Sequence, residues 1–113
     1  MNTSHYTLTL CNPITGQGLN EKVESAIIAE LREMDQTAAL AFGPDGICDN
    51  DVSWNRYEKT MAEISRRHPF VLFEMECVGF SFTGFRTDYF LDSKCQSVEG
   101  SVEYPPFDIT KLK

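Results

Sequence analysis

Hydrophobic and polar residues alternate along several stretches of the chain, with the period of two that is typical of a half-buried β-strand. The clearest stretch is residues 70–78, in which every second side chain from Val71 to Cys77 is apolar. Residues 6–10 alternate in the same way. Residues 87–91 and 95–104 flank a polar turn and together predict a hairpin. The pattern therefore predicts at least four strands.

Two other stretches carry apolar side chains at the spacing of a helix that buries one face. In the first they are Val23, Ile27, Leu31 and Met34, and in the second they are Trp54, Tyr57, Met61 and Ile64. Asn20 is a suitable N-cap, so the first helix is expected over residues 21–34. The second is expected to begin after Asp51 or Ser53 and to end before Pro69, because proline disfavours helical geometry in the residue that precedes it.

Residues 37–42, with the sequence TAALAF, are too short for periodicity to distinguish a strand from a helical turn, and we expect a short strand. The order of elements is then strand, helix, short strand, helix and three strands. This order predicts a single α+β domain over residues 1–113. In it, two helices pack on one face of an antiparallel sheet of four to five strands.

The composition narrows the class of protein. Of the 113 residues, 42% are hydrophobic, which is enough for one core and excludes a disordered tail or a fibre. Seventeen acidic residues against ten basic ones give a net charge of −7, which disfavours direct binding to nucleic acid or to a membrane and favours a basic protein partner. The first residues have neither a basic segment nor a long apolar run, so we expect a cytoplasmic protein.

The cysteines are far apart in the sequence, with no C-x-x-C pair: Cys11, Cys48, Cys77 and Cys95. This spacing indicates reduced thiols rather than a redox motif or a standard zinc site. A mixed zinc site would have to recruit His5 or His68 from distant segments. The acids Asp45, Asp49 and Asp51 lack the glycine and glutamate that an EF-hand requires. We therefore expect no metal and no cofactor.

Acidic residues are concentrated in the first 51 positions, which contain eight acids and two bases. The candidate partner-binding acids in this segment are Glu21, Glu24, Glu30, Glu33, Asp45, Asp49 and Asp51. On the first helix and in the loop that follows, they could form a negative surface that steers a basic partner. The other interpretation is a solvated helix face with capping acids, and both can hold together.

A glycine-flanked segment supplies a second group of candidate binding residues, Phe80, Phe82 and Phe85. Large aromatic side chains in such a segment either fold back over the core or anchor a partner. The segment does not match the G-x-S-x-G pattern of a nucleophile elbow.

Groups for catalysis are harder to find. Carboxylates alternate along two predicted strands, at Glu74 and Glu76 and at Glu99 and Glu103. They would come close if those strands pair, but a solvated sheet face explains them better than paired acid and base groups do. No Ser/His/Asp or Cys/His arrangement has a supporting spacing, so we do not expect an enzyme.

The second half of the chain also resembles small uncharacterised proteins carried by phages and other mobile elements. The residues that carry the resemblance are Trp54, Tyr57, Met61, HPFVLF at residues 68–73, Tyr89, Phe90, Lys94 and PPFD at residues 105–108. It covers about half of the chain. It implies an accessory protein that acts by binding, and anti-CRISPR and other anti-defence inhibitors are a subset of such proteins.

These observations favour a non-enzymatic inhibitor that covers a basic, nucleic-acid-binding surface on a host or defence protein. One alternative is an immunity protein or antitoxin that neutralises a toxic nuclease, and another is a small enzyme or ligand-binding module that uses carboxylates in a sheet cleft. A homodimer is compatible with each of these.

Overall fold

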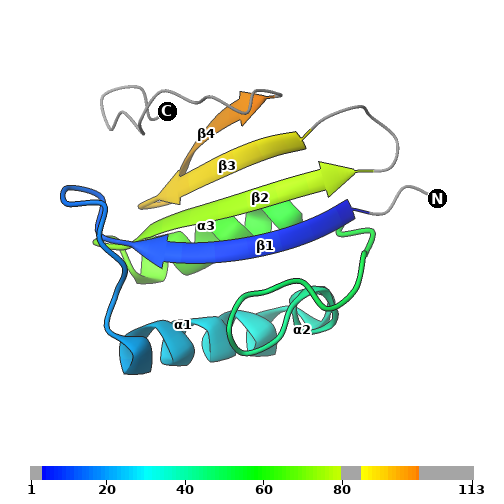
Figure 1. The fold of residues 1–113 in the computed structure, drawn as a ribbon, viewed down its shortest axis with the longest axis horizontal. Helices are drawn as coiled ribbons and strands as arrows, with labels where there is room; N and C mark the ends of the chain where they lie inside the picture. Colours follow the sequence, from blue (N-terminus) through cyan, green and yellow to red (C-terminus); the bar gives the residue numbers. More distant parts are fainter. Residues whose placement is uncertain (1–3, 80–84, 100–113) are drawn as a thin grey trace.

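A sheet of four antiparallel strands forms one layer of the protein, and the helices lie on one side of it (Figure 1). The computed structural model describes residues 4–79 and 85–99. The elements in chain order are β1 (Ser4–Cys11), α1 (Glu21–Met34), α2 (Gln36–Ala41), α3 (Tyr57–Arg67), β2 (Leu72–Gly79), β3 (Phe85–Leu91) and β4 (Lys94–Glu99). The predicted α+β class and antiparallel sheet are confirmed.

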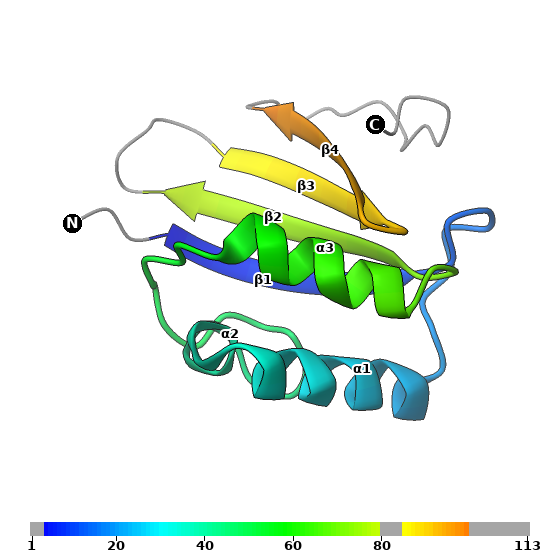
Figure 2. The same ribbon diagram turned by 180° about the vertical axis from the view of Figure 1, so that it is seen from behind.

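The strands follow one another across the sheet in the order β1, β2, β3, β4. The connection from β1 to β2 contains all three helices, whereas β2, β3 and β4 are consecutive in the sequence (Figure 2). The predicted hairpin is confirmed as β3 and β4, joined at Asp92 and Ser93. Both turn residues have positive φ, 48° and 66°, as a two-residue hairpin turn of type I′ requires.

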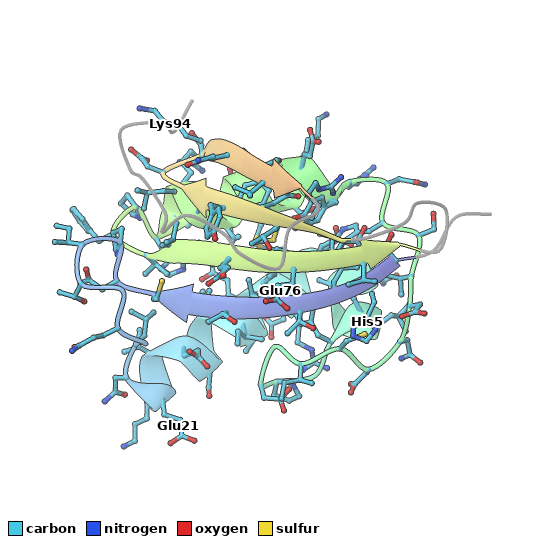
Figure 3. The ribbon with its side chains drawn as sticks, turned by 45° about the horizontal axis from the view of Figure 1, so that its top comes forward. His5, Glu21, Glu76 and Lys94 are labelled. Atoms are coloured by element: carbon cyan, nitrogen blue, oxygen red, sulfur yellow. The ribbon has the colours of Figure 1, made fainter. Side chains whose placement is uncertain are left out.

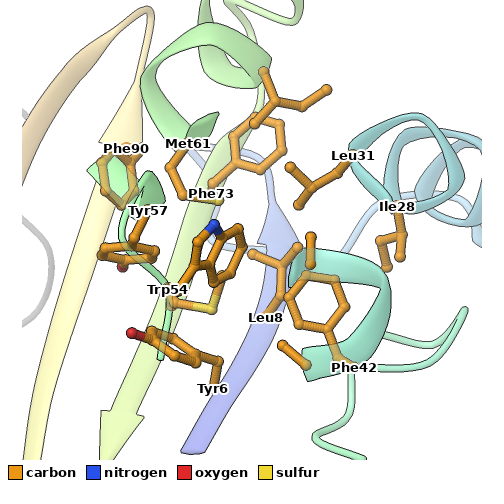
Figure 4. Close-up of a cluster of buried hydrophobic side chains, with 14 of the residues drawn as sticks. Tyr6, Leu8, Ile28, Leu31, Phe42, Trp54, Tyr57, Met61, Phe73 and Phe90 are labelled. Carbon is orange, nitrogen blue, oxygen red and sulfur yellow. The ribbon is translucent and has the colours of Figure 1, made fainter. Parts of the chain in front are cut away.

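The core lies between the inner face of the sheet and the helices (Figure 4). Phe73, Met75 and Cys77 point into it from β2, as their alternation predicts. A chain of aromatic rings crosses the core, with ring-centre distances of 5.2 Å from Tyr6 to Trp54, 5.3 Å from Trp54 to Tyr57 and 5.7 Å from Tyr57 to Phe90. Edge-to-face pairs of this kind add to the stabilisation from burial.

The prediction of a short strand over residues 37–42 is wrong, because these residues form helix α2 and its C-cap. The Asp35 carboxylate caps the helix by accepting a hydrogen bond of 2.9 Å from the Thr37 backbone N–H. Ala38 and Ala41 then pack into the core, where their small side chains allow the helix to approach closely. The cap residue precedes the TAALAF segment, so the hydrophobic pattern of that segment does not include it.

The second predicted helix begins later than expected. Helix α3 starts at Tyr57, with Arg56 rather than Asp51 or Ser53 at its N-cap position. Trp54 therefore lies before the helix, although it is buried as predicted. The strand predicted from residue 70 begins at Leu72, and Phe70 is 84% exposed. The predicted extension of β4 to residue 104 lies outside the described residues.

Candidate functional site

Residues 43–52, which we call the edge loop, run along the free edge of β1. The Ser4 and Val52 backbones exchange hydrogen bonds of 2.8 and 2.9 Å, and the Leu8 N–H donates to the Gly46 carbonyl at 2.9 Å. Gly46 has a φ of +82°, and a Cβ at this position would lie 2.6 Å from the Leu8 carbonyl oxygen. Only glycine permits this close approach, so the loop is fixed to the sheet by its backbone.

Three of the candidate acids are exposed side chains of the edge loop: Asp45, Asp49 and Asp51. The first two converge, since a Cβ on Gly43 would lie 3.4 Å from Asp45 Oδ1 and 3.2 Å from Asp49 Oδ2. Asp45 also accepts a hydrogen bond from the Ile47 N–H, which orders the turn. The structure therefore holds negative charge at defined positions on one edge of the molecule.

The acids of α1 do not form one compact patch with the edge loop. Glu21 lies in the first turn of α1 and Glu33 in the last, which are twelve residues or about 18 Å apart along the axis. Figure 3 shows Glu21 and His5 at opposite ends of the molecule. His5 lies beside the edge loop, where it contacts Asp51. Glu24 is partly buried and lies in the first turn of α1, near Glu21. Because charges separated by more than about 8–10 Å are screened at physiological salt, the two ends act as separate negative surfaces.

Glu30 binds groups within the chain. Its carboxylate contacts His68 Nε2 at 2.8 Å and Arg67 Nη1 at 3.0 Å, which joins α1 to the end of α3. Hydrogen bonding to His68 and then to Arg67 lowers the pKa of Glu30, against a smaller opposing effect of burial. This acid is therefore occupied in holding two helices together.

Sequence reasoning missed the role of Asp35, which lies between α1 and α2. Its carboxylate accepts hydrogen bonds of 2.7 Å from Trp54 Nε1 and 2.7 Å from Thr60 Oγ1, besides capping α2. Burial alone would raise the pKa of Asp35. The hydrogen bonds from Thr60, Trp54 and Thr37 together have a larger effect, so the pKa lies below its usual value of 3.8. The signal in the sequence is an aspartate two residues before the TAALAF segment, in an N-cap position.

A buried polar group on the inner face of the sheet was also missed. Asp88 is only 3% exposed, and it accepts hydrogen bonds from Tyr57 Oη at 2.8 Å and Ser97 Oγ at 2.6 Å. Arg86 Nε lies 3.0 Å from Asp88 Oδ1. Burial raises the pKa of Tyr57 and raises that of Cys77 to about 11, so both are protonated at neutral pH. Protonated and enclosed, these groups are poorly suited to nucleophilic chemistry.

The two strands that carry the candidate carboxylates do not pair with each other. Glu74 and Glu76 belong to β2 and Glu99 belongs to β4, and β3 lies between these two strands. Burial, followed by the neighbouring Glu76, raises the pKa of Glu74. Glu103 lies outside the described residues.

Of the aromatic candidates, Phe85 begins β3, where its backbone pairs with Val78. Phe80 and Phe82 lie outside the described residues. The proposed role of these rings as anchors therefore stays a prediction.

One group of potential metal ligands is present within residues 4–79 and 85–99. His5 on β1 lies beside Cys48 and Asp51 of the edge loop, and their ligand atoms are within 4.8 Å of one another. The sequence offered no spacing for such a site, because 43 positions separate the histidine from the cysteine.

Comparison with family models, with curated proteins and with solved structures finds no match to this chain. Among the described helices, none combines the length and apolar character needed to cross a membrane.

Proposed function

We propose that this protein is a non-enzymatic inhibitor that covers a basic surface of a nucleic-acid-binding host or defence protein in the cytoplasm, as anti-CRISPR proteins do. The observation that supports the proposal is the edge loop, where the exposed carboxylates Asp45, Asp49 and Asp51 stand on a backbone fixed to β1. A rigid display of charge binds with little loss of conformational freedom.

The uneven distribution of charge would orient a basic partner on the protein. The segment through Asp51 carries eight acids and two bases, whereas residues 56–67, which include α3, carry four bases and two acids. A basic partner would be attracted to the edge loop and the end of α1 that bears Glu33, and repelled from the exposed bases of α3. Complementary charge of this kind mainly raises the association rate and fixes the orientation of the complex.

The test compares two variants with the same change in net charge. E33Q/D45N/D49N removes exposed acids at the proposed surface, and E58Q/E76Q/D92N removes exposed acids elsewhere. Each protein is used to capture partners from nuclease-treated host lysate. The association rate of each with the purified partner is then measured at increasing salt.

We expect the first variant to associate at least about tenfold more slowly at low salt and to lose most of the salt dependence. The second should behave like the unmodified protein. Equal association by the two variants, or the absence of any stoichiometric basic partner, would refute the proposal. A partner that is a toxic nuclease encoded beside this protein would instead identify an immunity protein.

A further inference from the structure

The strongest unassigned feature is the group formed by His5, Cys48 and Asp51. His5 Nδ1 lies 3.2 Å from Asp51 Oδ1, and the cysteine sulfur completes a triangle in which no two ligand atoms are more than 4.8 Å apart. The residues come from β1 and from the edge loop (Figure 3 labels His5).

The backbone brings these three side chains together. The N–H groups of Ser4 and Leu8 point from β1 towards the edge loop, where they donate to Val52 and Gly46. Within the edge loop, the Cys48 thiol donates a hydrogen bond to the Asn50 carbonyl at 3.6 Å. An isolated bridge between Phe42 and Cys48 also fixes the cysteine from the other side. The backbone positions of the three residues are therefore fixed before any metal binds.

We propose that His5, Cys48 and Asp51 bind a zinc ion through one nitrogen, one sulfur and one oxygen, with a fourth coordination position left open. These are the three donor types that zinc prefers, with bond lengths of about 2.0–2.3 Å in tetrahedral geometry. Tetrahedral ligands at such distances lie about 3.4 Å apart, close to the 3.2 Å that already separates His5 Nδ1 from Asp51 Oδ1.

Only a small adjustment is needed at the third ligand. Cys48 is half-buried, and His5 and Asp51 are exposed, so side-chain rotation can bring the sulfur closer without disturbing the core. The carboxylate of Asp49 is close enough to Cys48 to act on it electrostatically, and its negative charge favours a cation in this position. An open fourth position is filled by water, or by a ligand from another molecule.

The zinc site does not depend on the proposed inhibitor function, and the variants used to test that function leave all three ligands unchanged. The two proposals share one residue of the edge loop, Asp51. A metal held between β1 and the loop would also stabilise the folded chain, because the three ligands come together only when it is folded.

The test uses untagged protein, kept reduced with a phosphine rather than a thiol, and titrated with Zn²⁺ by calorimetry and with Co²⁺ by absorption. We expect one ion per chain and a sulfur-to-cobalt charge-transfer band, since a soft thiolate binds the metal directly. H5A, C48S and D51N should each weaken zinc binding by about tenfold or more. C48S should also abolish the band.

The matched controls are C95S and D45N, which change the same residue types outside the group and should retain full affinity. A readout on the unmodified protein avoids any effect of a variant on folding: zinc should protect Cys48, but not Cys95, from alkylation mapped by mass spectrometry. The proposal is wrong if zinc fails to bind, if the charge-transfer band survives in C48S, or if the controls lose as much affinity as the ligand variants.

Discussion

The aspartates in the interior and those of the edge loop use the same side chain for opposite purposes. Asp35 and Asp88 each accept hydrogen bonds from at least two side chains, and their donors come from elements far apart in the sequence. Asp45 and Asp49 instead accept at most one local backbone hydrogen bond and face solvent. The number of donors around a carboxylate thus separates acids that hold the fold together from acids that are free to meet a partner.

The largest expected effect comes from removing an interior acid. D88A would leave the Tyr57 hydroxyl, the Ser97 hydroxyl and the Arg86 guanidinium without their common acceptor. Breaking a buried charge pair in this way costs about 3–5 kcal/mol of unfolding free energy. Urea denaturation measures the loss. The matched edge-loop change D49A should cost less than about 0.5 kcal/mol, and similar losses in the two variants would contradict the comparison.

A smaller effect, which depends on pH, is expected at Asp35. Its pKa is lowered below the usual 3.8 in the folded state, so its carboxylate stabilises the protein above that pH. The contribution is lost as the pH falls through the folded-state pKa. D35N should therefore be less stable than the unmodified protein by about 1–2 kcal/mol at pH 7, and the difference should narrow below pH 3.8.

Denaturation curves between pH 7 and pH 2.5 provide this measurement. D45N is the control, because its carboxylate is exposed and makes one turn hydrogen bond. A stability difference between D35N and the unmodified protein that stays constant over the whole range would show that the charge of Asp35 is not what stabilises the fold.

The smallest effect on unfolding free energy is expected at Glu30. This residue is more exposed than the interior Asp88 and less exposed than Asp49 of the edge loop. Its ion pairs with Arg67 and His68 join α1 to α3 at the surface, where solvent screens them. E30Q should lower the unfolding free energy by about 0.2–1 kcal/mol, and the loss should shrink as salt is raised. Thermal unfolding at low and high salt tests this. A salt-independent loss of several kcal/mol would place Glu30 with the interior acids instead.

The sequence predicts the regular parts of the fold well, because alternation and helical spacing report burial directly. The bounds of α1 agree with the structure, and the inner face of β2 is as predicted. Helix α2 was missed because it depends on the Asp35 cap, which lies outside the TAALAF segment, and on the burial of two small side chains, which is a tertiary feature. Local periodicity carries no information of that kind.

The candidate site is less accessible to sequence reasoning. The aspartates of the edge loop could be named as candidates, but their convergence around Gly43 depends on the backbone path. The proximity of His5 to Cys48 depends on pairing between Ser4 and Val52, which are 48 positions apart. No spacing rule covers contacts made by an irregular loop against a strand.

The position of β1 has a consequence for the order in which the protein assembles. Its only strand partner among the described residues is β2, and 60 residues of chain separate Cys11 from Leu72. Closing so long a loop costs entropy before any contact compensates for it, whereas β2, β3 and β4 can pair as consecutive hairpins. We therefore expect β1 to dock on β2 late in folding, after β2, β3 and β4 have paired.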